Sequence, residues 1–127
     1  MKKKLCALLV VILTATFLAT TALAAEPRWT NVTLINPAIS ENGSYANTVS
    51  CVSGTSKIEC TMVLYQKGLF GTYSEVSRSS DVYYGDTYRF TGHYNIQSGK
   101  TYKLTTTVIA TCNGVSEEVS TSFEKDF

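Results

Sequence analysis

Apolar and polar side chains alternate most regularly in residues 58–65, where every second position is apolar. A period of two is typical of a strand that turns one face toward a core. The same period runs through residues 101–111. We therefore predict a half-buried strand in each segment. The inward positions are Ile58, Cys60, Met62 and Leu64 in the first, and Tyr102, Leu104, Thr106, Val108 and Ala110 in the second.

Asn113 and Gly114 follow the second strand and precede another strand pattern at residues 115–123. The Asn-Gly pair favours a two-residue hairpin turn, because both turn positions need a positive φ. That turn fixes a register, and the register brings apolar residues together on one face. The expected pairs are Cys112 with Val115, Ala110 with Glu117, Val108 with Val119, and Leu104 with Phe123.

Four weaker strand patterns cover residues 30–35, 45–53, 72–79 and 88–94. Turn-forming residues cluster between the strands, at 41–44, 53–56, 67–68, 85–86 and 98–100. Short strands with turns at this spacing are typical of a two-sheet sandwich. We predict an all-β domain, an immunoglobulin- or fibronectin-like antiparallel β-sandwich of about seven strands.

The inward face of residues 45–53 stays open at this point. One interpretation turns Val49 and Cys51 toward the core, and the other turns Ala46, Ser50 and Val52 toward it. Both fit a period of two, so the pattern does not choose between them.

The N-terminus has the pattern of a secretory signal peptide. Lys2, Lys3 and Lys4 precede residues 5–25, which contain no charged side chain and end in small residues. This arrangement predicts a signal helix in residues 1–24 and a single domain in residues 25–127. Cleavage is expected after Ala24, with Ala25 as the second choice. An uncleaved membrane anchor is the alternative. We expect a secreted, extracellular protein with no stable membrane span after cleavage.

Cleavage changes the charge balance of the chain. The whole sequence has eleven basic and ten acidic side chains, and loss of the three lysines leaves eight basic against ten acidic, a net charge of about −2. The remaining basic residues form no cluster in the sequence, so the electrostatic attraction that drives nucleic-acid binding has no source. We expect no nucleic-acid partner.

Several turns and strand edges resemble small exported proteins of Gram-positive bacteria of unknown function. The matching segments are Gly54, residues 57–58, 64–67 and 99–104, the turn at Asn113, and residues 116–117. The resemblance covers most of the predicted domain. It implies the same fold and a bacterial source, and it carries no functional residue.

Cys51, Cys60 and Cys112 remain after cleavage, whereas Cys6 leaves with the signal peptide. In a sandwich of alternating strand directions, we expect all three at one end of the domain. A Cys60–Cys112 disulfide and a Cys51–Cys60 disulfide are equally favoured, with Cys51–Cys112 behind. The alternative is three reduced thiols that pack as small apolar residues.

Candidate catalytic groups are sparse in the sequence. His93 is the one histidine, and its place near a strand end favours a solvated residue over a general base. Glu117 and Glu118 are consecutive on a strand and so point to opposite faces, and Asp81 and Asp86 are interpreted as turn residues. We expect no enzyme activity, no metal site and no cofactor.

Four tyrosines close together in the sequence suggest a binding surface, because exposed tyrosine offers rigid amphipathic area to proteins and sugars. Core packing is the alternative use of these rings. We predict a non-enzymatic extracellular binding module for a protein or a cell-wall glycan. A small secreted toxin or antimicrobial polypeptide is the second hypothesis. The four are Tyr83, Tyr84, Tyr88 and Tyr94.

Overall fold

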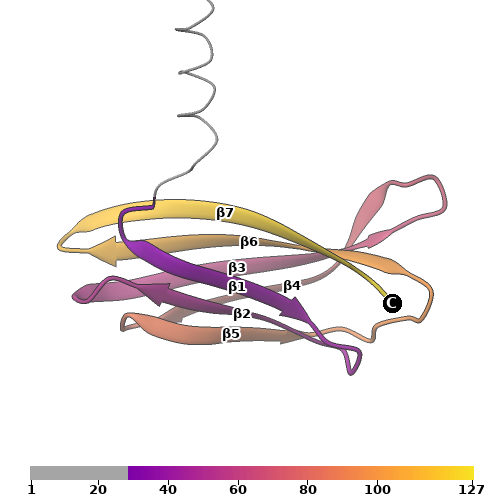
Figure 1. Ribbon diagram of the computed structural model, residues 1–127, viewed down its shortest axis with the longest axis horizontal. Coiled ribbons are helices and arrows are strands. Elements are labelled where there is room, and N and C mark those ends of the chain that lie inside the picture. Colours follow the sequence, from indigo (N-terminus) through magenta and orange to yellow (C-terminus); the bar gives the residue numbers. More distant parts are fainter. Residues whose placement is uncertain (1–28) are drawn as a thin grey trace, which may run out of the picture.

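The computed structural model describes residues 29–127, which form seven strands in two antiparallel sheets (Figure 1). Residues 1–28, with the predicted signal helix and cleavage site, lie outside the described residues. The predicted all-β class is confirmed. The three-stranded sheet has the order β1-β2-β5, formed by β1 (Val32–Ile39), β2 (Ser44–Cys51) and β5 (Thr87–His93). The four-stranded sheet has the order β4-β3-β6-β7, formed by β3 (Thr55–Lys67), β4 (Tyr73–Tyr83), β6 (Thr101–Cys112) and β7 (Val115–Asp126).

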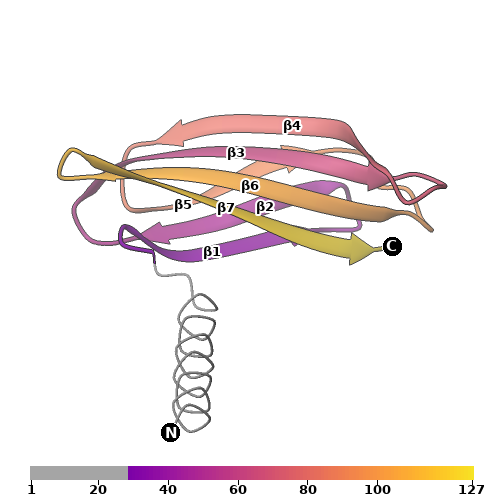
Figure 2. The ribbon, with the colours of Figure 1, turned by 90° about the horizontal axis from the view of Figure 1, so that it is seen from above.

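The two sheets lie face to face and enclose one apolar core (Figure 2). The central strands β2, β3 and β6 contribute alternate residues to that core, as a pleated strand with one buried face does. In β6 every second residue from Tyr102 to Cys112 is buried, which confirms the predicted inward face. The largest fully buried side chains are Tyr45, Tyr102, Phe90, Ile58, Met62, Leu64 and Leu104.

The β6–β7 hairpin has the predicted register at all four residue pairs. Its turn uses Asn113 and Gly114 with φ of 52° and 76°, as the Asn-Gly pair indicated. Agreement between turn chemistry and the apolar pattern explains why this register could be derived locally.

The structure also resolves the inward face of β2. Tyr45, Asn47, Val49 and Cys51 are buried and alternate along the strand, as the first interpretation had it. The ring of Tyr45 lies directly over Gly92 of β5, where an added Cβ would come within 2.3 Å of it. The neighbouring Ala46 is also buried, because β2 is the central strand of its sheet and both neighbours shield so small a side chain.

β1 and β4 extend furthest beyond their predicted ends, each by four residues. β1 continues through Pro37 to Ile39, which an edge strand permits because proline there needs no ladder donor. β4 continues to Tyr83, so Asp81 pairs with Cys60 inside the sheet. The interpretation of Asp81 as a turn residue is therefore wrong, whereas Asp86 does lie in the turn between β4 and β5.

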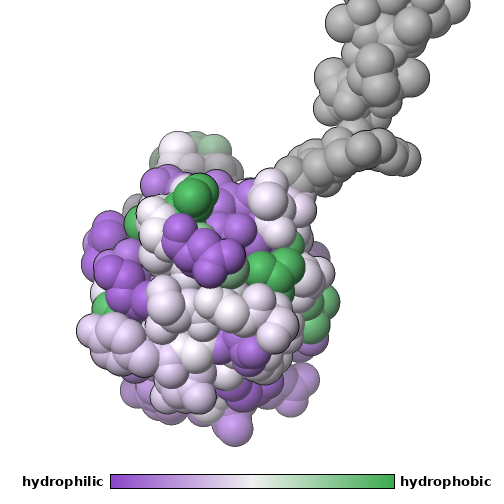
Figure 3. Space-filling view, turned by 90° about the vertical axis from the view of Figure 1, so that its left-hand side faces the viewer, coloured by the Kyte–Doolittle hydropathy of each residue, from purple (hydrophilic) through white to green (hydrophobic). Residues whose placement is uncertain are grey.

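Polar contacts hold the start of β1 against the four-stranded sheet. The carboxylate of Glu117 accepts backbone N–H bonds from Thr30, Asn31 and Val32 at 2.6, 2.9 and 3.1 Å. The buried amide of Asn31 donates to the carbonyl oxygens of Ala110 and Val115. We call this end, where β2 and β6 also terminate, the closed end. Figure 3 looks onto it and shows mostly hydrophilic and neutral residues, with hydrophobic ones scattered.

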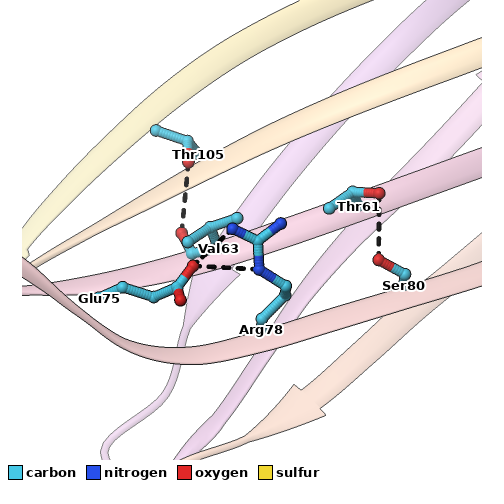
Figure 4. A network of polar contacts seen from close by, with 6 residues as sticks. All are labelled: Thr61, Val63, Glu75, Arg78, Ser80 and Thr105. Carbon is cyan, nitrogen blue, oxygen red and sulfur yellow. Dashed lines mark hydrogen bonds and ion pairs between the residues drawn. The ribbon is translucent and has the colours of Figure 1, made fainter.

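The outer face of the four-stranded sheet is also polar (Figure 4). Arg78 donates to the Glu75 carboxylate at 2.6 and 3.0 Å. Ser80 donates to the hydroxyl of Thr61, while Thr105 donates to the carbonyl oxygen of Val63. These polar groups thus find hydrogen-bond partners on β4, β3 and β6.

Candidate functional site

Two large apolar side chains stand almost fully in solvent at the turn between β3 and β4. Leu69 is 95% exposed and Phe70 is 94% exposed. Gly68 precedes them and Gly71 follows them, and we call residues 68–71 the hairpin tip. Exposure of single apolar residues is common, but two adjacent large ones with almost no cover make this turn the candidate site.

The backbone of the hairpin tip is ordered by its own hydrogen bonds. The N–H of Gly68 donates to the carbonyl oxygen of Thr72 at 2.7 Å, and the N–H of Gly71 donates to that of Gly68 at 3.1 Å. Gly71 has a φ of +78°, a conformation that a residue with a side chain rarely adopts. The turn therefore presents Leu69 and Phe70 in one backbone arrangement.

A cluster of side chains fixes the base of the same hairpin. The ammonium nitrogen of Lys103 lies 4.2 Å from the ring centroid of Tyr73 and 5.4 Å from that of Tyr65. The Tyr73 hydroxyl donates to Glu124 at 2.9 Å. Desolvation, followed by this contact with the Glu124 carboxylate, raises the pKa of Tyr73. Cation–π and hydrogen-bond contacts thus connect β3, β4, β6 and β7 beneath the tip.

An irregularity in strand pairing turns the hairpin away from the sheet. Leu64 pairs with Ser77 and Tyr65 pairs with Glu75, so Val76 is an extra residue on β4. Such a bulge bends the strand and increases its twist. Beyond this point the hairpin projects past the end of the sandwich in both views (Figures 1 and 2).

Charged residues surround the hairpin tip. Lys67 and Lys100 line a shallow hollow together with Leu69, between the tip and the turn that precedes β6. Asp126 lies next to this hollow and accepts a hydrogen bond from Thr101 at 2.7 Å. The apolar pair is therefore bordered by two lysines and one carboxylate.

The predicted tyrosine surface is divided between the two ends of the domain. The rings of Tyr83 and Tyr88 stack at 4.3 Å with an interplanar angle of 6°, and Tyr88 packs edge-on against buried Phe90 at 4.9 Å. Tyr84 is 77% exposed beside them. Tyr94 lies beyond the other end of β5, where it packs near Tyr102. Three of the four rings therefore take part in packing, and Tyr84 alone of the four is freely presented.

The three cysteines are free and buried. Cys60 lies inside β3 and pairs with Val108, so it is not at the closed end with Cys51 and Cys112. The expectation that all three share one end is wrong, because β3 begins at Thr55, earlier than its pattern indicated. β2 and β3 also belong to different sheets, so Cys51 and Cys60 do not face each other in a hairpin.

Burial governs the acidity of two of these thiols. It raises the pKa of Cys60 to about 11, against a hydrogen bond from Asn47 that lowers it. It also raises the pKa of Cys51 to about 11, with additional effects from the charges of Asp86, Glu117 and Cys112. Neither group has the depressed pKa of a nucleophilic cysteine.

The remaining candidate groups lie apart from one another. His93 is exposed at the end of β5, beside the turn at Gly43. Glu117 is bound to backbone amides as described, and Glu118 points to the opposite face. Within residues 29–127, no three metal-ligating side chains gather. In the same part of the chain, no helix is long and apolar enough to cross a membrane.

Sequence reasoning missed the hairpin tip. Only residues 67–68 are predicted as a turn, because of the glycine, and the two apolar residues that follow Gly68 are given no role. The available signal was an apolar pair flanked by glycines between two strand patterns. That signal indicates a turn, but it does not show whether another element covers the pair.

Comparisons with known proteins assign no family. No protein-family model and no curated protein matches the chain. Among solved structures, AT1g01470 of Arabidopsis thaliana has a TM-score of 0.42 at 14% identity, over 76% of this chain and 80% of that one. A β-glucuronidase of Bacteroides uniformis has a TM-score of 0.38 at 12% identity, over 76% of this chain and 13% of the enzyme. The functional argument therefore rests on the residues themselves.

Proposed function

We propose that the chain is a secreted, non-enzymatic binding module that docks into an apolar pocket of a partner protein through its hairpin tip. The exposure of Leu69 and Phe70 carries this proposal. The facing sheets β1-β2-β5 and β4-β3-β6-β7 support an immunoglobulin- or fibronectin-like sandwich, a fold that hosts many unrelated functions.

A protein pocket suits the chemistry of the tip better than a sugar does. Leu69 and Phe70 offer no hydrogen-bond donor or acceptor, whereas sugar rings are bound by aromatic faces combined with polar groups. Central apolar anchors surrounded by polar contacts are typical of protein interfaces. Lys67 and Lys100 would then meet an acidic rim around the partner's pocket.

The ordered turn supports tight docking. The tip's hydrogen bonds and the cation–π contacts at its base reduce the conformational entropy that binding would cost. Full burial of the two side chains would contribute about 3–6 kcal/mol in total, at about 1.5–3 kcal/mol each. That corresponds to a change in affinity of roughly 10²- to 10⁴-fold.

A retention experiment tests the proposal. The secreted form of the chain is immobilised beside two variants, L69S/F70S and Y84S, and exposed to extracellular and cell-surface proteins of its source. We expect a protein retained by the unmodified chain and by Y84S but lost with L69S/F70S. Tyr84 is the matched control because it is a large exposed ring at the opposite end. Retention by L69S/F70S but not by Y84S would contradict the proposal and favour a surface around Tyr84.

The second candidate, a secreted toxin or antimicrobial polypeptide, uses the same feature in another way. Lys67 and Lys100 beside an apolar tip also suit an anionic lipid surface, although one such tip gives weak membrane binding. Flotation with vesicles of mixed anionic and zwitterionic lipid distinguishes the two. Flotation that L69S/F70S abolishes favours the toxin, and its absence alongside protein retention favours the binding module.

A further inference from the structure

We propose that Cys51 and Cys112 are the partners of a disulfide that joins the two sheets, while Cys60 remains a free thiol. This inference is independent of the proposed binding function. It concerns the closed end, and it reverses the order in which the sequence ranked the three possible pairs.

The position of Cys60 along the sandwich excludes it as a partner. Its sulfur lies 4.0 Å from the amide nitrogen of Asn47 on β2, and its strand neighbour on β6 is Val108. Cys60, Asn47 and Val108 therefore lie at the same height along the strand axes, which we call one level of the core. A rise of about 3.3 Å per residue places Cys51 and Cys112, each four residues further along its strand, roughly 13 Å from that level. Disulfides need Cα atoms within about 7 Å of each other.

The same offset brings Cys51 and Cys112 together. β2 and β6 run in the same direction in the two sheets, so four residues along each strand lead to the same end (Figure 1). Both side chains are inward-facing and buried, at 8% and 9% exposure. Each cysteine is the last residue of its strand, which places both beside the turn that connects the two sheets.

That turn brings the chain after Cys51 into contact with Cys112. Thr55 donates its N–H to the carbonyl oxygen of Val52 at 3.2 Å, and Thr55 is the strand partner of Cys112. A Cβ placed on Gly54 would lie 3.9 Å from the sulfur of Cys112. The sulfur thus lies under the short turn that begins immediately after Cys51.

Oxidation of this pair is a balanced thiol–disulfide exchange. One thiolate attacks a disulfide oxidant and releases one thiol of that oxidant, and the second cysteine displaces the other thiol. The protein loses two protons and two electrons, and the oxidant gains both as two thiols. Burial disfavours the thiolate of Cys51 most and so raises its pKa, and the charges of Asp86, Glu117 and Cys112 disfavour it further. Thiol–disulfide exchange is therefore faster during folding, while the thiols are exposed, than in the native state, where they are buried.

A bond between β2 and β6 would close a loop of about 60 residues and raise the unfolding midpoint by roughly 10 °C or more. Cys60 is 2% exposed and is shielded from solvent, so the odd thiol makes no bridge between molecules. The odd number of cysteines is thereby explained by one intrachain bond and one core residue.

Refolding under redox control tests the inference. The reduced secreted chain is refolded in a mixture of oxidised and reduced glutathione, denatured, labelled with maleimide and mapped by mass spectrometry. We expect one labelled cysteine, Cys60, and one linkage, between Cys51 and Cys112. Cys60→Ser should form the same linkage with the same rise in midpoint, and Cys51→Ser and Cys112→Ser should lose both. A linkage that includes Cys60, a disulfide-linked dimer, or three labelled thiols would overturn the inference.

Discussion

At the closed end, polar groups from separate chain segments contact one another, whereas at the hairpin end two apolar side chains contact solvent. Glu117 and Asn31 use their polar atoms on backbone groups of neighbouring strands. Leu69 and Phe70 expose nearly all of their surface to solvent. The contacts of the closed end contribute to stability, whereas the exposure of the hairpin tip is the basis for the proposed binding.

Both ends of the domain are ordered, but the hairpin end holds two large apolar side chains almost fully in solvent. The hairpin is also held by hydrogen bonds, in its turn and between Tyr73 and Glu124 at its base. Its apolar residues are exposed because the turn holds them out, and not because the segment lacks structure. An exposed apolar pair buries little surface on folding and lowers solubility, and the proposed binding function accounts for its presence.

The largest expected effect is on binding at the hairpin tip. L69S/F70S should weaken partner binding by roughly 10²- to 10⁴-fold, because it removes both apolar anchors. The free energy of unfolding should change by less than about 0.5 kcal/mol, since neither side chain is buried. Calorimetric titration and chemical unfolding of the same variant measure the two quantities. A large loss of stability would show that the tip is part of the fold.

Glu117 tests the closed end. Glu117→Ala removes the acceptor of three backbone N–H bonds and should lower the free energy of unfolding by about 1–3 kcal/mol. Partner binding at temperatures where the variant is folded should not change. Urea unfolding, with Glu118→Ala as the matched exposed control, measures the effect. An equal loss in the two variants would contradict the role given to Glu117.

The same carboxylate gives the closed end a pH dependence. Partial burial opposes its ionisation, but the N–H groups of Thr30, Val32 and Asn31 together lower the pKa of Glu117. A lowered folded-state pKa gives stability that is fully present above the unfolded value of about 4.3 and is lost as the pH falls through the folded value. The unfolding midpoint should therefore decrease in acid, and Glu117→Gln should flatten that decrease. A slope unchanged by Glu117→Gln would assign it to other groups.

Gly92 tests the packing that supports the hairpin end. Gly92→Ala should cost about 1–3 kcal/mol, because its new Cβ would meet the buried ring of Tyr45. The cost should decrease in a Tyr45→Leu background, which leaves more space over β5. A double-mutant cycle by urea unfolding measures this coupling. Independent, additive effects would show that the close approach of ring and glycine is not limiting.

Asn47 gives the smallest expected effect. Its side chain is fully buried and its Oδ1 has no hydrogen-bond partner in the described part of the chain. Asn47→Leu should be neutral or stabilise the domain by up to about 1 kcal/mol, because an unsatisfied buried acceptor is replaced by a side chain of the same branched shape. Thermal unfolding of Asn47→Leu beside the cavity-forming Asn47→Ala distinguishes polarity from volume. A clear loss in both variants would show that the amide stabilises the core.

Local patterns were sufficient for the strands and for one register. Alternation located all seven strands, and Asn113 with Gly114 fixed the β6–β7 pairing because turn and pattern act within a few residues. The ends of β1 and β4 were missed because Pro37 and Asp81 resemble residues that stop a strand. Both are tolerated at the edges of these sheets.

The sites depended on contacts between sheets, which no local pattern contains. The level of Cys60 follows from its contact with Asn47 on the facing sheet, and the role of Tyr88 from its stacking on Tyr83. The exposure of Leu69 and Phe70 follows from the irregularity at Val76 and the path of the hairpin beyond it. An apolar pair in a turn has the same sequence whether it is covered or free.

Hydrogen–deuterium exchange of the secreted chain, alone and bound to the captured protein, tests the division between the two ends most directly. We predict that binding slows exchange in residues 67–73 and leaves residues 52–55, 84–87 and 113–115 unchanged. Slower exchange centred on residues 84–87, with none in residues 67–73, would contradict the assignment of binding to the hairpin tip.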